Sequence, residues 1–115
     1  MKKDPNLFLE PPTLLNASTS MLQIRQLNNL TIFCLVQGDP KPNIHWTFIN
    51  GSIMDHSKIH ITSSENNRTF FVESRLQLNH VTYELHHGSY KCIATNPYGN
   101  ITETIEVKVL GLSLI

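Results

Sequence analysis

The side chains of this 115-residue chain that could do chemistry are its two cysteines and six histidines. Cys34 and Cys92 are separated by about half the length of the chain. In an oxidising compartment a disulfide between them would close a long loop and add roughly 4 kcal/mol of stability in the chain-entropy description. In a reducing compartment they would remain buried free thiols. Their redox state therefore indicates where the protein works.

The histidine spacings do not predict a metal site. His86 and His87 are adjacent, so in an extended chain their side chains point to opposite sides. His56 and His60 lie four residues apart in a segment without a helical pattern. The alternative to a metal site is solvated loop histidines, which we favour, and we expect neither a metal nor a cofactor.

Catalytic motifs are also missing from the sequence. It contains no glycine-rich phosphate loop, no Gly-x-Ser-x-Gly and no His-Glu-x-x-His. A nucleophilic cysteine needs access and a lowered thiol pKa, which burial in a core would deny to both cysteines. We therefore predict that the chain is not an enzyme and has no small-molecule substrate.

Five asparagines stand in the pattern Asn-x-Ser/Thr without proline in the middle, which is the acceptor pattern for N-glycans. They are Asn16, Asn29, Asn50, Asn67 and Asn100. Together they favour the secretory pathway, where glycans are attached and disulfides persist. We predict the extracellular portion of a cell-membrane protein.

The charge balance excludes several partners. Nine basic and nine acidic residues give a formal net charge of zero, so no long-range field attracts nucleic acid or an anionic membrane. Aromatic residues are few and spread along the chain, which does not favour a stacking platform for single-stranded nucleic acid. We expect a protein partner that is held by shape and local contacts.

The elements that position the cysteines are predicted to be β-strands. Apolar side chains alternate around Cys34, around Trp46 and around Cys92, which is the period-two pattern of half-buried strands. Turn signals recur along the chain and no helical period is present. The prediction is an all-β antiparallel sandwich of seven to eight strands in two sheets.

Composition sets the expected boundaries of this single domain. Residues 1–12 hold three prolines and no periodic pattern, so we assign them to a tether. Residues 13–110 form the domain and residues 111–115 a linker. No signal peptide or membrane span is expected. The expected strands fall at 14–24 (split), 29–37, 43–49, 58–62, 69–79, 89–95 and 101–109, with a crossover at 81–87.

Strand parity predicts an apolar patch on one outer face. If Ile32, Cys34 and Val36 point inward, Phe33 and Leu35 point outward. Inward Leu76 and Leu78 likewise place Phe71 outside. Two interpretations of this patch are equally open: a partner site, or a surface covered by the first strand or the N-terminal segment.

Several motifs together resemble an immunoglobulin domain of the intermediate (I-set) type, over nearly the whole chain. They are Gly38 to Pro42, Trp46, Leu76 to Leu78, Gly88 to Cys92 and Asn96 to Gly99. The resemblance implies a Cys34–Cys92 disulfide that joins two sheets and packs on Trp46. It also implies a tyrosine corner at Tyr90 and a core position for Leu78.

Three stretches are similar to the membrane-proximal immunoglobulin domain of Trk neurotrophin receptors: residues 46–58, 76–79 and 88–99. This resemblance implies binding of a dimeric growth factor through residues 23–28, 53–58 and 81–84, and thereby activation of a receptor kinase. The candidate contact residues are Asp55, His56, Thr82, Tyr83 and Glu84. The sequence departs from that family by keeping both cysteines at the usual buried positions, by a longer crossover, and by His86 where an aspartate is usual.

Three functional hypotheses follow. The first is an extracellular ligand-binding module of a single-pass receptor. The second is a structural or adhesion module of a neural cell-adhesion-type protein, with homophilic or heterophilic contacts; its self-associating version is a homodimer through Phe33, Leu35 and Phe71. The third is an intracellular cytoskeletal domain, which requires free thiols.

Overall fold

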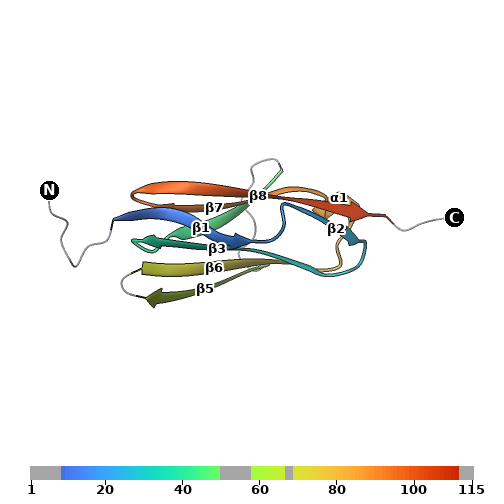
Figure 1. Ribbon diagram of the computed structural model, residues 1–115. Helices are drawn as coiled ribbons and strands as arrows, with labels where there is room; N and C mark the ends of the chain where they lie inside the picture. Colours follow the sequence, from blue (N-terminus) through green and yellow to red (C-terminus); the bar gives the residue numbers. More distant parts are fainter. Residues whose placement is uncertain (1–8, 50–57, 67–68, 112–115) are drawn as a thin grey trace.

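The computed structural model describes residues 9–49, 58–66 and 69–111. In this part of the chain eight strands form two four-stranded layers (Figure 1). One sheet has the order β1-β3-β6-β5 and the other β2-β8-β7-β4. The elements are β1 (Glu10–Ala17), β2 (Met21–Arg25), β3 (Leu30–Asp39), β4 (Asn43–Phe48), β5 (Ile59–Asn66), β6 (Thr69–Leu78), α1 (Tyr83–His86), β7 (Gly88–Asn96) and β8 (Gly99–Leu110).

The predicted all-β sandwich is confirmed, with one exception to its antiparallel pairing. β2 pairs with β8 in parallel, from Met21 opposite Glu106 to Arg25 opposite Leu110. The exception arises because the first strand is split. β1 runs antiparallel to β3 in one sheet, and the chain then continues in β2 as an edge strand of the other sheet (Figure 1).

β1 begins inside the segment that the sequence assigned to a tether. Glu10 pairs with Asp39 at the end of β3, and Asn96 Nδ2 donates to the carbonyl oxygens of Glu10 (2.7 Å) and Pro40 (2.9 Å). Prolines fit here because β1 is an edge strand, whose outer N–H groups have no ladder partner to lose. Residues 10–12 therefore belong to the sheet.

The crossover between the layers contains a short helix, α1, that the sequence pattern did not predict. Thr82 is its N-cap, and the Thr82 hydroxyl accepts the N–H of Leu85. Four residues are too few to show a helical period. Gly88 follows with φ +145°, and a Cβ there would lie 3.3 Å from the ring of Phe48. Glycine at this position lets the chain leave α1 and enter β7.

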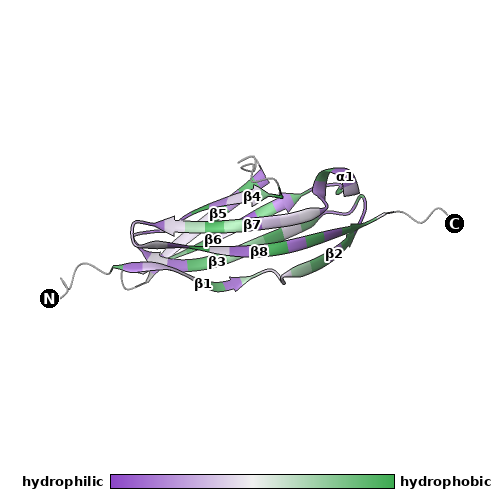
Figure 2. Cartoon of the chain, turned by 90° about the horizontal axis from the view of Figure 1, so that it is seen from above, coloured by the Kyte–Doolittle hydropathy of each residue, from purple (hydrophilic) through white to green (hydrophobic). Residues whose placement is uncertain are grey.

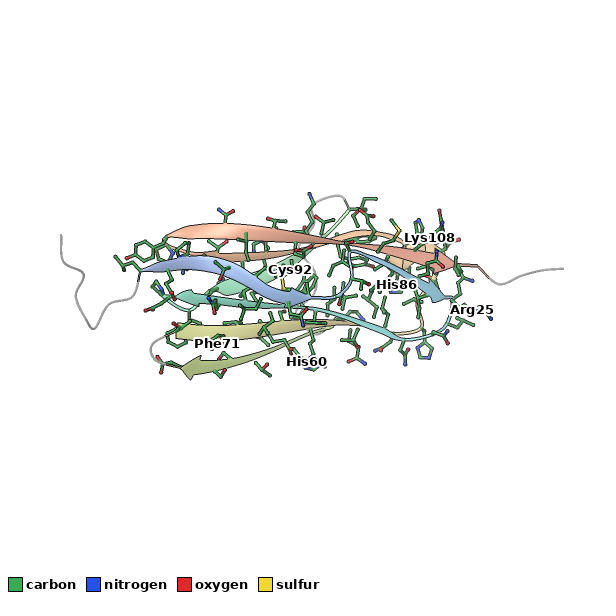
Figure 3. All side chains as sticks on the ribbon, viewed as in Figure 1. Arg25, His60, Phe71, His86, Cys92 and Lys108 are labelled. Carbon is green, nitrogen blue, oxygen red and sulfur yellow. A yellow bond between two sulfur atoms is a disulfide. The ribbon has the colours of Figure 1, made fainter. Side chains whose placement is uncertain are left out.

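The core lies between the layers and is built by alternation, which Figure 2 shows along β8 as hydrophilic and hydrophobic residues in turn. The cysteines form a disulfide between the two sheets (Figure 3). Trp46, Leu78 and Tyr90 are all buried. Tyr90 donates its hydroxyl to the carbonyl oxygen of His86 at 2.7 Å, and burial raises the pKa of Tyr90 well above its ordinary value. This bond holds the first residues of β7 against the end of α1.

A second bridge between the sheets lies beside the disulfide. Ser74 pairs with Cys34 across β6 and β3, and Trp46 pairs with Cys92 across β4 and β7. The indole Nε1–H of Trp46 donates to Ser74 Oγ at 2.9 Å, and both residues are fully buried. The disulfide joins β3 to β7, and the hydrogen bond joins β6 to β4. Both bonds therefore link the β3–β6 pair of one sheet to the β4–β7 pair of the other.

Replacement of Ser74 by alanine should leave the buried indole N–H of Trp46 without its partner. The free energy of unfolding should then fall by about 1–3 kcal/mol, the cost of an unsatisfied buried donor. Ser63→Ala, at an exposed position of β5, is the matched control and should change the free energy of unfolding by less than about 0.5 kcal/mol. Urea denaturation measures both values, and equal effects of the two substitutions would contradict this role of Ser74.

Candidate protein-contact site

One end of the sandwich gathers the turn between β2 and β3, the crossover with α1, and the end of β8. Figure 3 places His86, Arg25 and Lys108 at this end and Phe71 toward the other. We call the surface formed by residues 26–29, residues 80–87 and Leu110 the α1 pole. Two of the three stretches that the Trk resemblance assigned to ligand contact, 23–28 and 81–84, therefore meet here.

Backbone hydrogen bonds hold the α1 pole together. The N–H of Leu27 donates to the carbonyl of Val81 (2.7 Å), and the N–H of Val81 donates to the carbonyl of Asn28 (3.0 Å). Gln26 donates its N–H to the carbonyl of Leu110 at 3.0 Å, and its side-chain Oε1 accepts the N–H of Tyr83 at 3.1 Å. The turn and the crossover are thereby fixed relative to both sheets.

The α1 pole exposes four large apolar side chains, three strongly and Leu110 at 36%. Leu27 is 57% exposed, Tyr83 54% and Leu85 69%, although Val81 beside them is fully buried. Leu27 also has a φ of 72°, a left-handed conformation that is uncommon for a leucine and costs energy. The surrounding hydrogen bonds maintain it. The result is a firmly held apolar surface in contact with water, which is a feature of protein contact sites.

Two imidazoles support the pole as hydrogen-bond acceptors. His86 Nδ1 accepts the N–H of Thr82 at 2.9 Å, and His87 Nδ1 accepts the N–H of Val109 at 3.1 Å. The ring of Tyr83 stacks on that of His87, with centroids 4.2 Å apart. Burial lowers the pKa of His86, opposed in part by the Thr82 backbone and aided by the charge of Lys58. The neutral imidazole that results can keep its acceptor role.

Among the residues that the structure describes, no three His, Cys, Asp or Glu side chains are placed to hold a metal ion. Within ranges 9–49, 58–66 and 69–111, no helix has the length and apolar character needed to cross a bilayer.

The sequence-predicted contact residues fall in three places. Thr82 is the half-buried N-cap of α1, and Tyr83 and Glu84 are exposed on its first turn. Asp55 and His56 lie outside the described residues. Phe33, Leu35 and Phe71 lie on the outer face of the β1-β3-β6-β5 sheet, away from the α1 pole.

The outer-face residues Phe33, Leu35 and Phe71 form a strip across β3 and β6, which we call the outer strip. Leu35 pairs with Glu73, and Phe71 pairs with Gln37, so Leu35 and Phe71 are diagonal neighbours. Both line a shallow hollow of about 270 Å³. All three strip residues are half-buried rather than exposed, because neighbouring side chains on the same face cover them in part. β1 pairs beside β3 and does not fold over the strip. The N-terminal segment before residue 9, the other candidate cover, lies outside the described residues.

Sequence reasoning missed three residues that matter for these surfaces. Leu85 stands among polar residues in the crossover, so the isolated leucine itself is the only signal in the sequence that could have marked it as a contact residue. Leu27 fell within a predicted contact stretch but was not singled out. Ser74 occupies an inward position between Val72 and Leu76, so strand parity could have identified it as a buried polar group that needs a partner.

The sandwich, its disulfide and its tyrosine corner define a class of protein. Residues 11–96 match the family model described as Immunoglobulin domain, and the chain belongs to this family. It is accordingly a non-catalytic module. The crystal structure of Dpr2 Ig1-Ig2 in complex with DIP-Theta Ig1-Ig3 shares this fold, with a TM-score of 0.71 and 21% identity over 90% of this chain and 33% of that chain.

Two longer proteins are similar to the chain in sequence. It is 32% identical over 103 residues to human leucine-rich repeat and fibronectin type-III domain-containing protein 4, covering 90% of this chain and 15% of that protein. It is 33% identical over 103 residues to the mouse neuronal cell adhesion molecule, covering 86% of this chain and 7% of that protein. The chain thus spans less than a fifth of each relative.

The lowered pKa of His86 predicts a pH dependence of stability. Below the ordinary value of 6.5, the unfolded chain takes up a proton on His86 that the folded chain does not, so the free energy of unfolding falls as the pH drops toward the folded pKa. His86→Gln keeps an acceptor for the Thr82 N–H but does not titrate. It should therefore lose less stability than the wild type between about pH 7.5 and pH 5.

Chemical denaturation across this pH range measures the difference. Thr62→Gln, a non-titrating substitution at an exposed position of β5, is the control and should keep the pH dependence of the wild type. If His86→Gln and the wild type lost the same stability on acidification, His86 would not be the group responsible.

Proposed function

We propose that this domain is an extracellular protein-recognition module of a cell-surface protein and that its α1 pole makes the contact. The observation that carries the proposal is the exposed apolar group Leu27, Tyr83 and Leu85, held in place by main-chain hydrogen bonds. An interface favours such side chains because they bury apolar area and, being already positioned, lose little conformational freedom on binding.

The relatives support an adhesion-type role. One of them is named a neuronal cell adhesion molecule, and this chain corresponds to a small part of each relative. We infer that it serves as one module among several in a membrane-anchored protein. A disulfide-linked core with glycan acceptor patterns suits an extracellular location, whereas an intracellular cytoskeletal domain would be expected to keep its thiols free.

A growth factor of the neurotrophin type is the more specific partner that the sequence resemblance implies. The resemblance and the meeting of residues 23–28 and 81–84 at the α1 pole support it. The relatives named above point instead to an adhesion-type partner. We therefore place the adhesion role first and receptor-kinase activation second. In either role the α1 pole would make the contact.

A binding comparison tests the proposal. The multimerised domain is assayed against three probes: a panel of neuronal cell-surface ectodomains, the domain itself, and dimeric neurotrophins. The double variant Tyr83→Ala, Leu85→Ala should weaken whichever contact is found at least about tenfold, because central apolar side chains carry most of the binding energy of an interface.

The matched control is Tyr98→Ala at the opposite end of the sandwich, where the tyrosine is 47% exposed. It should change affinity less than about twofold. Thermal melts check that all variants fold. Binding that survives the double variant, or that depends on Tyr98 instead, would contradict a contact at the α1 pole.

A further inference from the structure

The acceptor pattern Asn16-Ala17-Ser18 runs along the edge of the outer strip. Asn16 is exposed on β1 and pairs with Leu35 on β3. Cross-strand partners share a face of the sheet, so the Asn16 side chain leaves from the same outer face as Leu35. Phe33 is the diagonal neighbour on that face. The acceptor nitrogen is thus placed beside two apolar side chains.

Local hydrogen bonds fix this arrangement. Ser18 donates its N–H to the carbonyl of Phe33 at 3.0 Å, and its hydroxyl accepts the N–H of Phe33 at 2.9 Å. Asn16 Oδ1 accepts the N–H of Ala17 at 2.9 Å, which turns the oxygen of the amide toward the backbone. The amide nitrogen, on the other side of the same carbon, then points away from that N–H.

We propose that Asn16 carries an N-linked glycan whose first sugars lie on the outer strip. In forming it, the Asn16 amide nitrogen releases one N–H proton to solvent and bonds the anomeric carbon of an oligosaccharide, while the C–O bond from that carbon to the lipid pyrophosphate carrier breaks and the carrier leaves with its electron pair. The inference depends on the extracellular location proposed above. It assigns the strip to a sugar rather than to a protein partner, which was one of the two interpretations that strand parity left open.

The chemistry of the strip suits a pyranose ring. The C–H groups on one face of such a ring carry partial positive charge and pack on the negative face of an aromatic ring such as Phe33. The rim is polar: Glu73 and Arg75 form an ion pair at 2.7 Å on neighbouring β6, and Thr62 and Ser64 line the adjoining hollow. β6 lies two strand spacings, about 10 Å, from β1, which is within reach of the first two sugars. Their hydroxyl groups can bond this rim.

Asn100 provides the internal comparison. It is also exposed and fits the same acceptor pattern, but it lies on β8 in the other sheet, and its cross-strand partner is Thr95. A glycan on Asn100 therefore starts beside a threonine, with Ile93 rather than an aromatic ring on the diagonal. The Asn16 glycan, by contrast, starts beside a leucine with a phenylalanine on the diagonal.

The test uses the 115-residue chain secreted from mammalian cells behind a cleavable signal. Mass spectrometry of the Asn16 peptide should show it glycosylated in most molecules. Asn16→Gln should lower Tm by roughly 4 °C, but by less than half as much in a Phe33→Thr background, because the first sugar then has no aromatic ring beside Asn16 to pack on. Asn100→Gln should lower Tm by no more than about 1 °C.

The same variants made in the bacterial periplasm, where no such glycan is added, measure the effect of the substitutions alone. There Asn16→Gln should cost equally little in the wild-type background and in the Phe33→Thr background. An unglycosylated Asn16, or a glycan whose loss costs the same in both backgrounds, would overturn the inference.

These failures differ from a failure of the proposed function. Asn16 bare while Asn29 or Asn100 is glycosylated would overturn the strip assignment and leave the extracellular role intact. Protein from its own source tissue with free thiols and no glycan at any acceptor asparagine would contradict the extracellular role itself.

Discussion

The Cys34–Cys92 disulfide and the Trp46–Ser74 hydrogen bond together form the constraint on which the rest of the structure depends. Each joins one sheet to the other, and the two lie side by side because their residues are cross-strand partners. A sandwich without them would still bury apolar side chains, but no cross-link in the core would fix one layer against the other. The tyrosine corner extends the same constraint from β7 to α1. In this way the buried bonds of the core help to position the α1 pole at the surface.

The surfaces of the domain differ in ways that suit different roles. The α1 pole exposes leucines and a tyrosine on a backbone that both sheets hold in place. The outer strip is half-buried and lies along a glycan acceptor pattern. A glycan on that strip would exclude a protein from one face and leave the pole accessible. A bare strip would instead be an apolar face that could associate with a second copy. The state of Asn16 thus bears on whether the domain recognises other proteins or itself.

Strand periodicity was enough to predict which face each of Phe33, Cys34, Trp46 and Cys92 occupies, because an extended chain alternates strictly. It could not predict α1, since one turn of helix is stabilised by a cap and by tertiary hydrogen bonds rather than by a repeating pattern. Nor could it predict that β2 pairs in parallel with β8, which depends on where the chain changes sheets. The α1 pole was foreseen in part, through resemblance: residues 23–28 and 81–84 were assigned to contact, but Leu85 was not. Contacts between distant segments decide such surfaces, and one sequence does not display them.

The measurement that tests this account most directly is hydrogen exchange at the α1 pole before and after reduction of the disulfide. In the oxidised chain the amides of Leu27, Val81 and Val109 should exchange slowly, as the hydrogen bonds of a fixed surface require. Reduction should speed exchange at the pole and in both sheets together, because it removes the covalent one of the two bridges that hold the layers in place. If the pole kept its protection after reduction, or exchanged as fast as an unstructured peptide while oxidised, the inter-sheet bridge would not be what positions it.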